Sequence, residues 1–178
     1  GGAARGATAL ARIASGARLR AALLVTRATP LRGSGDVAGG SAPGQVRVVA
    51  DHLNVSGGSL FPAPGMVSAG WDATLTERLG SLRGVSGSSV VALVPGPLRP
   101  SPAESRALVS LGADAAVTDS VAEAMVLASR GVAVSALTYL DAPAAGGNLG
   151  RAQLSLRQAS GVTLAAVEEI LRSLRAGS

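Results

Sequence analysis

Residues 95–123 read PGPLRPSPAESRALVSLGADAAVTDSVAE, and this stretch decides the fold class. Ser101, Pro102 and Glu104 have the spacing of a helix start, with an N-cap serine, a proline in the first turn and a capping-box glutamate. The apolar residues that follow continue the helix, and Gly112 is the residue type that most often ends one. The stretch therefore predicts a helix with both ends specified.

The second half of the same stretch predicts a strand and then another helix. Residues 113–118 are short and apolar, as expected of a buried strand. Ser120 and Glu123 repeat the capping-box spacing, which predicts a helix that stops at Gly131. Strands that alternate with helices are typical of α/β domains with parallel pairing.

The flanking sequence extends this alternation in both directions. Apolar runs predict further strands at 20–26, 45–53, 88–94 and 132–140. Helices are expected at 7–17, at 73–82 and at the C-terminus, where Leu164, Val167, Ile170, Leu171 and Leu174 recur at helical spacing. Segments rich in Gly, Pro and Ala or Ser are expected to be loops, at 28–44, 54–70 and 141–153. We expect a single layered α/β domain over residues 1–178, with a mixed sheet flanked by helices.

Composition narrows the classes of function. The 178 residues are 47% hydrophobic and 2% aromatic, so the core must be built from Ala, Val and Leu. The net charge is +5 and all 16 basic residues are arginines, but they are scattered with few aromatics between them, which argues against a nucleic-acid partner. No apolar run reaches membrane-spanning length and no signal peptide is visible, so we expect a cytoplasmic protein without a membrane partner.

Metal chemistry is also unexpected. The chain has no cysteine and one histidine, His52, which excludes cysteine-ligated and multi-histidine metal sites. His52 has two interpretations, a catalytic base or a structural residue that ties a loop, and the second is the more common for a lone histidine. Glu168 and Glu169 are adjacent on the last predicted helix, and we expect them to face water.

Four segments, in order, resemble the trimeric purine nucleoside phosphorylases. They are the VADHLNV run at 49–55, Pro95–Pro97 with the PAESR run at 102–106, the LGAD run at 111–114 with Val121 and Glu123, and the AAG run at 144–146. The resemblance covers about residues 16–146. It implies the nucleoside-phosphorylase fold with the N-terminal part of that fold missing, and a trimeric assembly of identical or related chains. It also implies a purine nucleoside or nucleotide as ligand and no cofactor, with inorganic phosphate as co-substrate if the chain is active.

The residues that the resemblance places at the ligand differ from those of the family. Arg27 and Ala28 stand where the family has its phosphate-side Asn-Ala pair, and Arg99 and Pro100 stand where it has the aromatic and glutamate that hold ribose and base. Thr118 and Asp119 replace its Met-Ser pair, which contacts ribose and phosphate. Ala142 replaces its base-binding asparagine, beside Asp141.

Three hypotheses follow from these substitutions. The first is a catalytically degenerate protein that acts as a structural or regulatory subunit. The second is an active phosphorylase in which Asp141 protonates or hydrogen-bonds purine N7 while Arg27 or Arg99 binds phosphate. The third is a sensor that binds an anionic nucleotide through the two arginines without turnover. The feature that discriminates the three hypotheses is whether these residues converge on one pocket.

Overall fold

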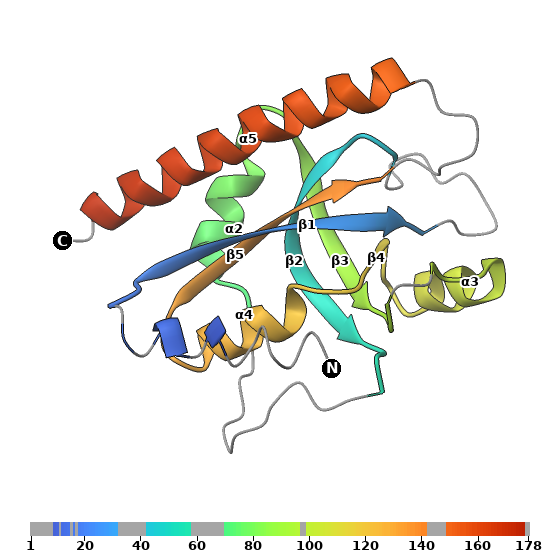
Figure 1. Cartoon of the computed structure of the whole chain (residues 1–178), viewed down its shortest axis with the longest axis horizontal. Helices are drawn as coiled ribbons and strands as arrows, with labels where there is room; N and C mark the ends of the chain where they lie inside the picture. The colour runs from blue at the N-terminus through green and yellow to red at the C-terminus, as the bar shows by residue number, and fades with distance from the viewer. Residues whose placement is uncertain are drawn as a thin grey trace.

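The computed structural model describes residues 9, 10, 12–14, 16, 18–31, 42–57, 70–96, 99–141 and 149–176, with the side chains of the last helix from residue 157 onward. The predicted alternation of strands and helices is present. The elements, in order, are β1 (Ala21–Pro30), β2 (Val46–Asn54), α2 (Ala73–Gly80), β3 (Val85–Leu93), α3 (Pro102–Ser110), β4 (Ala115–Val117), α4 (Val121–Ala128), β5 (Ala133–Leu140) and α5 (Leu149–Ala176). Figure 1 shows α5 on one side of the strands and α4 on the other.

The strands form a closed barrel in the order β1-β4-β3-β2-β5. Three pairs are parallel, β1 with β5, β2 with β3 and β3 with β4. Two short antiparallel contacts close the barrel, one between β2 and β5 over Val46–Val48 and one between β1 and β4 at Thr29 and Pro30. The mixed sheet flanked by helices is thus confirmed, although the sequence did not predict its closure.

Both faces of the sheet are packed with small aliphatic side chains, as the composition requires. One cluster joins the barrel to α4 and includes the fully buried Val121 and Leu140. Another lies beneath α2 and α5 and includes Leu79 and Ala166. Small residues such as Ala166 allow a helix to approach a sheet closely, so few aromatic residues are needed.

Helix α3 forms with both of its predicted ends. The Ser101 side chain accepts a hydrogen bond from the Glu104 N–H, and the Glu104 carboxylate accepts one from the Ser101 N–H. At the other end, Gly112 has φ of +95° and donates to the Val109 carbonyl, while Ala113 donates to Leu108. These two bonds are the Schellman pattern, which requires a residue that tolerates positive φ.

The capping box predicted at the start of α4 is wrong. Ser120 has φ of +67°, and its hydroxyl donates to the carbonyl of Asp119 instead of capping the helix. A capping serine needs an extended backbone to aim its oxygen at the third helical N–H, and a left-handed residue does not provide one. The spacing of Ser120 and Glu123 predicted the motif, but the backbone conformation of Ser120 prevents it from forming.

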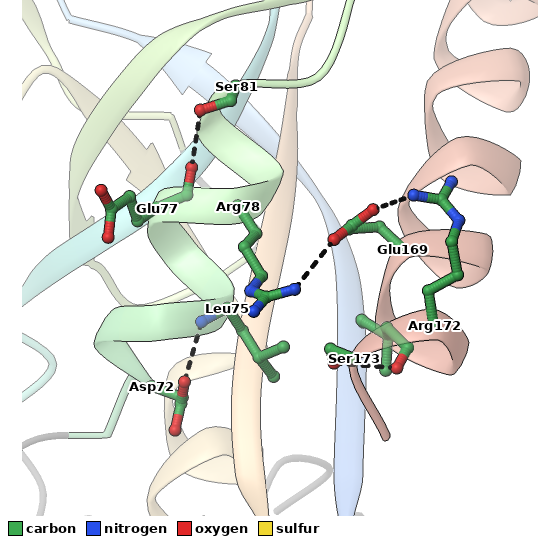
Figure 2. A network of polar contacts seen from close by, with 9 residues as sticks. Asp72, Leu75, Glu77, Arg78, Ser81, Glu169, Arg172 and Ser173 are labelled. Atoms are coloured by element: carbon green, nitrogen blue, oxygen red, sulfur yellow. Dashed lines mark hydrogen bonds and ion pairs between the residues drawn. The ribbon is translucent and has the colours of Figure 1, made fainter. Parts of the chain in front are cut away.

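Several boundaries also differ from the prediction. Residues 28–30 continue β1 and do not begin a loop, and α5 begins at Leu149, inside the loop predicted at 141–153. The expectation that Glu169 faces water is wrong as well. Its side chain is 14% exposed and pairs with Arg78 of α2 and Arg172 of α5, as Figure 2 shows. Among the described helices, none is both long and apolar enough to cross a bilayer.

Candidate functional site

The ends of three strands bring most of the predicted ligand residues together. Arg27 and Ala28 lie near the carboxyl end of β1, and Asp141 directly follows β5, its parallel neighbour. Thr118 and Asp119 directly follow β4. Ligand sites often form where strands end, because loops held by a rigid scaffold can place side chains there without disturbing the core.

These residues line one cavity of about 330 Å³. Its lining residues are Arg27, Ala28, Thr29, Val94, Arg99, Pro100, Ala116, Thr118, Asp119 and Asp141. Every site residue that the sequence predicted and the structure describes is in this set. The remaining one, Ala142, lies outside the described residues, as do Gly146 and its neighbours.

Asp141 is the centre of the charged part of the cavity. Its Oδ2 atom accepts from Arg27 Nη2 at 2.7 Å and from Arg99 Nη2 at 3.3 Å. The Asp141 side chain is 24% exposed, whereas those of Arg27 and Arg99 are 75% and 46% exposed. Ion pairs that are this exposed contribute little to stability, so their main effect is to set where charge lies in the cavity.

Asp119 supplies a second carboxylate, and it is held by the buried Thr26. The Thr26 hydroxyl donates a hydrogen bond to Asp119 Oδ1. The cavity therefore has two arginines and two aspartates among its lining residues, so its formal charges balance. The part of the chain that the structure describes contains no cluster of three or more metal-ligating side chains.

Gly96 packs closely against Thr118, which lines the charged cavity. A Cβ atom at Gly96 would lie 3.2 Å from the Thr118 Cβ, closer than side chains normally pack. Glycine at this position thus allows the chain after β3 to approach the end of β4. Gly96 belongs to the Pro-Gly-Pro segment on which part of the family resemblance rests. Thr26 had no such signal in the sequence, because its role depends on a contact with a residue 93 positions away.

A second, mostly apolar cavity adjoins the first. It has a volume of about 550 Å³ and shares Val94, Arg99 and Pro100 with the charged cavity. Its remaining lining residues are Val55, Pro95, Ser101, Glu104, Ala107 and Leu108. Arg99 and Pro100 therefore form a wall between a charged and an apolar compartment.

His52 does not line the charged cavity. Its Nδ1 atom accepts a hydrogen bond from the Trp71 indole N–H at 3.3 Å, and the two rings meet edge to face with centroids 6.1 Å apart. Burial lowers the pKa of His52, while the nearby Asp51 carboxylate opposes that shift. This geometry favours the structural interpretation, with the histidine tying Trp71 to β2.

Solved structures of purine nucleoside phosphorylases are similar to this fold. The Schistosoma enzyme in complex with hypoxanthine matches with a TM-score of 0.67 at 17% identity, covering 90% of this chain and 64% of that one. The Schistosoma mansoni enzyme in complex with inosine gives the same values. A Schistosoma mansoni complex with the compound BCX-34 matches with a TM-score of 0.59 at 19% identity, covering 86% of this chain and 62% of that one.

These matches establish the fold. The chain has the fold of the purine nucleoside phosphorylases, and it spans about 64% of the length of the structures that it matches. No protein-family model and no curated protein matches its sequence. At 17% identity the fold does not carry function, which must be argued from the residues of the cavity.

Proposed function

We propose that this chain is a purine-nucleoside-phosphorylase-like protein that has lost phosphorolysis and acts as a structural or regulatory subunit of an oligomer. In this proposal the charged cavity still accepts a purine nucleoside or nucleotide. The observation that carries the proposal is the Arg27–Asp141–Arg99 arrangement, in which one carboxylate oxygen accepts from two guanidinium groups.

The hydrogen bonds that Asp141 makes argue against the family's chemistry. Cleavage of the N-glycosidic bond leaves negative charge on the purine, which a donor at N7 must stabilise. An ionised carboxylate only accepts hydrogen bonds, and this one already accepts from Arg27 and Arg99. Asp141 in this arrangement therefore holds the two arginines and offers no proton to a base.

Asp119 argues against the phosphate co-substrate. By resemblance it stands where the family has a phosphate-binding hydroxyl, and its carboxylate would repel phosphate. The bond from Thr26 fixes the aspartate in place, so that repulsion would be retained. Loss of one charge-stabilising contact typically costs about 10²–10³ in rate, and this cavity differs from the family at several positions.

The test is a phosphate-dependent cleavage assay with inosine, guanosine and adenosine, on chain shown to be folded by circular dichroism. We expect no release of free base above the no-enzyme rate at any phosphate concentration. Phosphate-dependent release of base that scales with protein concentration would contradict the proposal. A fully active purine nucleoside phosphorylase assayed in parallel controls for the assay itself.

The second candidate is an active phosphorylase with substituted residues. It is favoured by the convergence of Arg27, Arg99 and Asp141 on one cavity, since a guanidinium can bind two phosphate oxygens. If it is correct, base release is detectable and Asp141→Ala abolishes it, whereas the matched exposed variant Glu168→Ala leaves it unchanged. Activity that persists in Asp141→Ala would show that Asp141 is not needed for base release.

The third candidate, a nucleotide sensor, needs binding without turnover. A ligand that binds only the native state raises its melting temperature with concentration. A nucleoside monophosphate that stabilises the wild-type chain but not an Arg27→Gln/Arg99→Gln variant would favour the sensor over a purely structural subunit.

A further inference from the structure

A third cavity lies between α2 and the strands β2 and β3, and we call it the α2 cavity. Its volume is about 680 Å³, and none of its lining residues lines the charged or the apolar cavity. Helix α2 contributes Ala73, Thr76, Glu77 and Gly80, which recur at i, i+3, i+4 and i+7 and so share one face of the helix. The cavity therefore follows α2 for about 10 Å, at a rise of roughly 1.5 Å per residue.

The α2 cavity is acidic. The described residues that line it include two carboxylates, Asp51 of β2 and Glu77 of α2, and no arginine. The arginines of these two elements are bonded elsewhere. Arg78 pairs with a carboxylate of α5, and Figure 2 shows Glu77 on the side of α2 turned away from α5. Arg47 donates to the Ser88 carbonyl at 2.9 Å. On a chain of net charge +5, this local excess of negative charge favours a cationic ligand.

Trp71 adds an aromatic wall to the α2 cavity. Its indole N–H donates to His52 Nδ1 at 3.3 Å, which holds the ring in one orientation. The face of an indole attracts ammonium groups, because the ring carries negative charge on its faces. Residues 55–70, which lead from β2 to this tryptophan, contain no charged residue, so this link supplies no positive charge to the carboxylates.

The remaining walls suit methylene groups better than a metal ion. Val48, Ala50 and Ala73 line the cavity with apolar side chains. Hard metal ions such as Ca²⁺ and Mg²⁺ take oxygen ligands, whereas most of these walls offer carbon. Thr76 is the exception, because its hydroxyl oxygen is buried and makes no hydrogen bond to any described residue. The walls therefore favour an organic cation with an aliphatic part.

We propose that the α2 cavity binds a straight-chain aliphatic diamine, with one ammonium group on Asp51, the other on Glu77 and the methylene chain along Trp71. Two carboxylates, one from β2 and one from α2, match two cations joined by an apolar chain. Each ammonium group has three donors and forms charge-assisted hydrogen bonds with a carboxylate, while its chain packs on apolar side chains. The inference does not depend on what the charged cavity binds, so the cleavage assay and the titrations below can fail separately.

The first test follows the fluorescence of Trp71, the single tryptophan of the chain, during titration with straight-chain diamines of increasing length. At pH 8, above the lowered pKa of His52, the imidazole ring is neutral, and sodium chloride keeps the ionic strength constant. We expect a diamine to saturate the signal between about 10 µM and 10 mM, the range of weak small-molecule binding. The monoamine of the same length should bind about tenfold more weakly, and the diol should not saturate. No saturation by any diamine, or equal affinity for the monoamine or for magnesium chloride, would overturn the proposal.

A second test locates the site with conservative variants. Asp51→Asn keeps an oxygen that can accept from the His52 N–H, and Glu77→Gln keeps a good helix former, so both should retain the circular dichroism of the wild type. Each should weaken diamine binding about tenfold, measured by calorimetry as well as by fluorescence. Glu168→Gln, which removes an exposed carboxylate from α5, should leave the affinity unchanged. Wild-type affinity in Asp51→Asn and Glu77→Gln, or an equal loss in Glu168→Gln, would show that the diamine does not bind in the α2 cavity.

Discussion

The segment from α3 to β4 and the charged cavity lie next to each other, but different kinds of contact determine their structures. In the α3–β4 segment, side chains bond to backbone groups close by, as Ser101, Glu104 and Gly112 show. In the cavity, Arg99 and Arg27 meet Asp141 across 42 and 114 residues, side chain to side chain. Local signals thus fix the scaffold, whereas the chemistry depends on contacts that exist only once the fold has formed.

Two aspartates five residues apart make the contrast concrete. Asp114 accepts from the buried Ser89 hydroxyl and from the Val90 N–H, and so ties β4 to β3. Asp119 accepts from Thr26 and lines the cavity. Asp114 should therefore affect the stability of the fold, and Asp119 should affect ligand binding. Substituting each aspartate tests this assignment.

The largest expected effect is on stability. Asp114→Ala leaves a buried hydroxyl and a backbone N–H without this acceptor, so we expect the free energy of unfolding to fall by about 2–3 kcal/mol. Asp119→Ala should cost less than about 1 kcal/mol, because the Thr26 hydroxyl also lies 3.3 Å from the Arg27 carbonyl. Urea unfolding of both variants measures the difference, and equal losses would refute the division between scaffold and cavity.

The next effect concerns anion binding in the cavity. Asp141→Asn removes the charge that Arg27 and Arg99 share, so we expect inorganic phosphate to bind about tenfold more tightly, a gain of about 1.4 kcal/mol. Calorimetric titration at constant ionic strength measures it. Glu168→Gln, which removes one charge from an exposed position on α5, should leave the affinity unchanged. An unchanged affinity in Asp141→Asn would mean that the arginines do not form an anion site.

The same contrast explains how far the sequence could predict the molecule. The order of strands and helices followed from periodicity and caps, and the resemblance pointed to seven described residues that line one cavity. The sequence did not predict barrel closure, because closure rests on two or three residues of β2–β5 and β1–β4 pairing. It also missed the partner of Glu169, since the position of Arg78 depends on how α2 packs against α5.

A smaller effect compares the two helix starts that share one spacing. Ser101→Ala removes a formed cap and should cost about 1 kcal/mol. Ser120→Gly should instead stabilise the chain by up to about 1 kcal/mol, because glycine tolerates the positive φ and no cap bond is lost. Thermal unfolding measures the stability of the two variants. A loss of stability in both would indicate that Ser120 caps α4 after all.

The α3 start also carries a pH dependence. Hydrogen bonds from Ser101 lower the pKa of Glu104 below its ordinary value of 4.5. The stabilisation is therefore present above pH 4.5 and is lost as the pH falls through the lowered pKa. The stability gap between wild type and Glu104→Gln should narrow over that acidic range, and a gap that is constant with pH would contradict the capping role.

The smallest effect concerns His52, which belongs to neither region. Burial lowers its pKa from the ordinary 6.5, so the fold favours the neutral ring. Its contribution to stability is present above pH 6.5 and is lost as the pH falls through the lowered value. Protonation of Nδ1 also removes the acceptor of the Trp71 N–H. Because Trp71 is the single tryptophan of the chain, its fluorescence should report a transition below pH 6.5 that His52→Gln abolishes. A transition that persists in His52→Gln would assign the titration to another group.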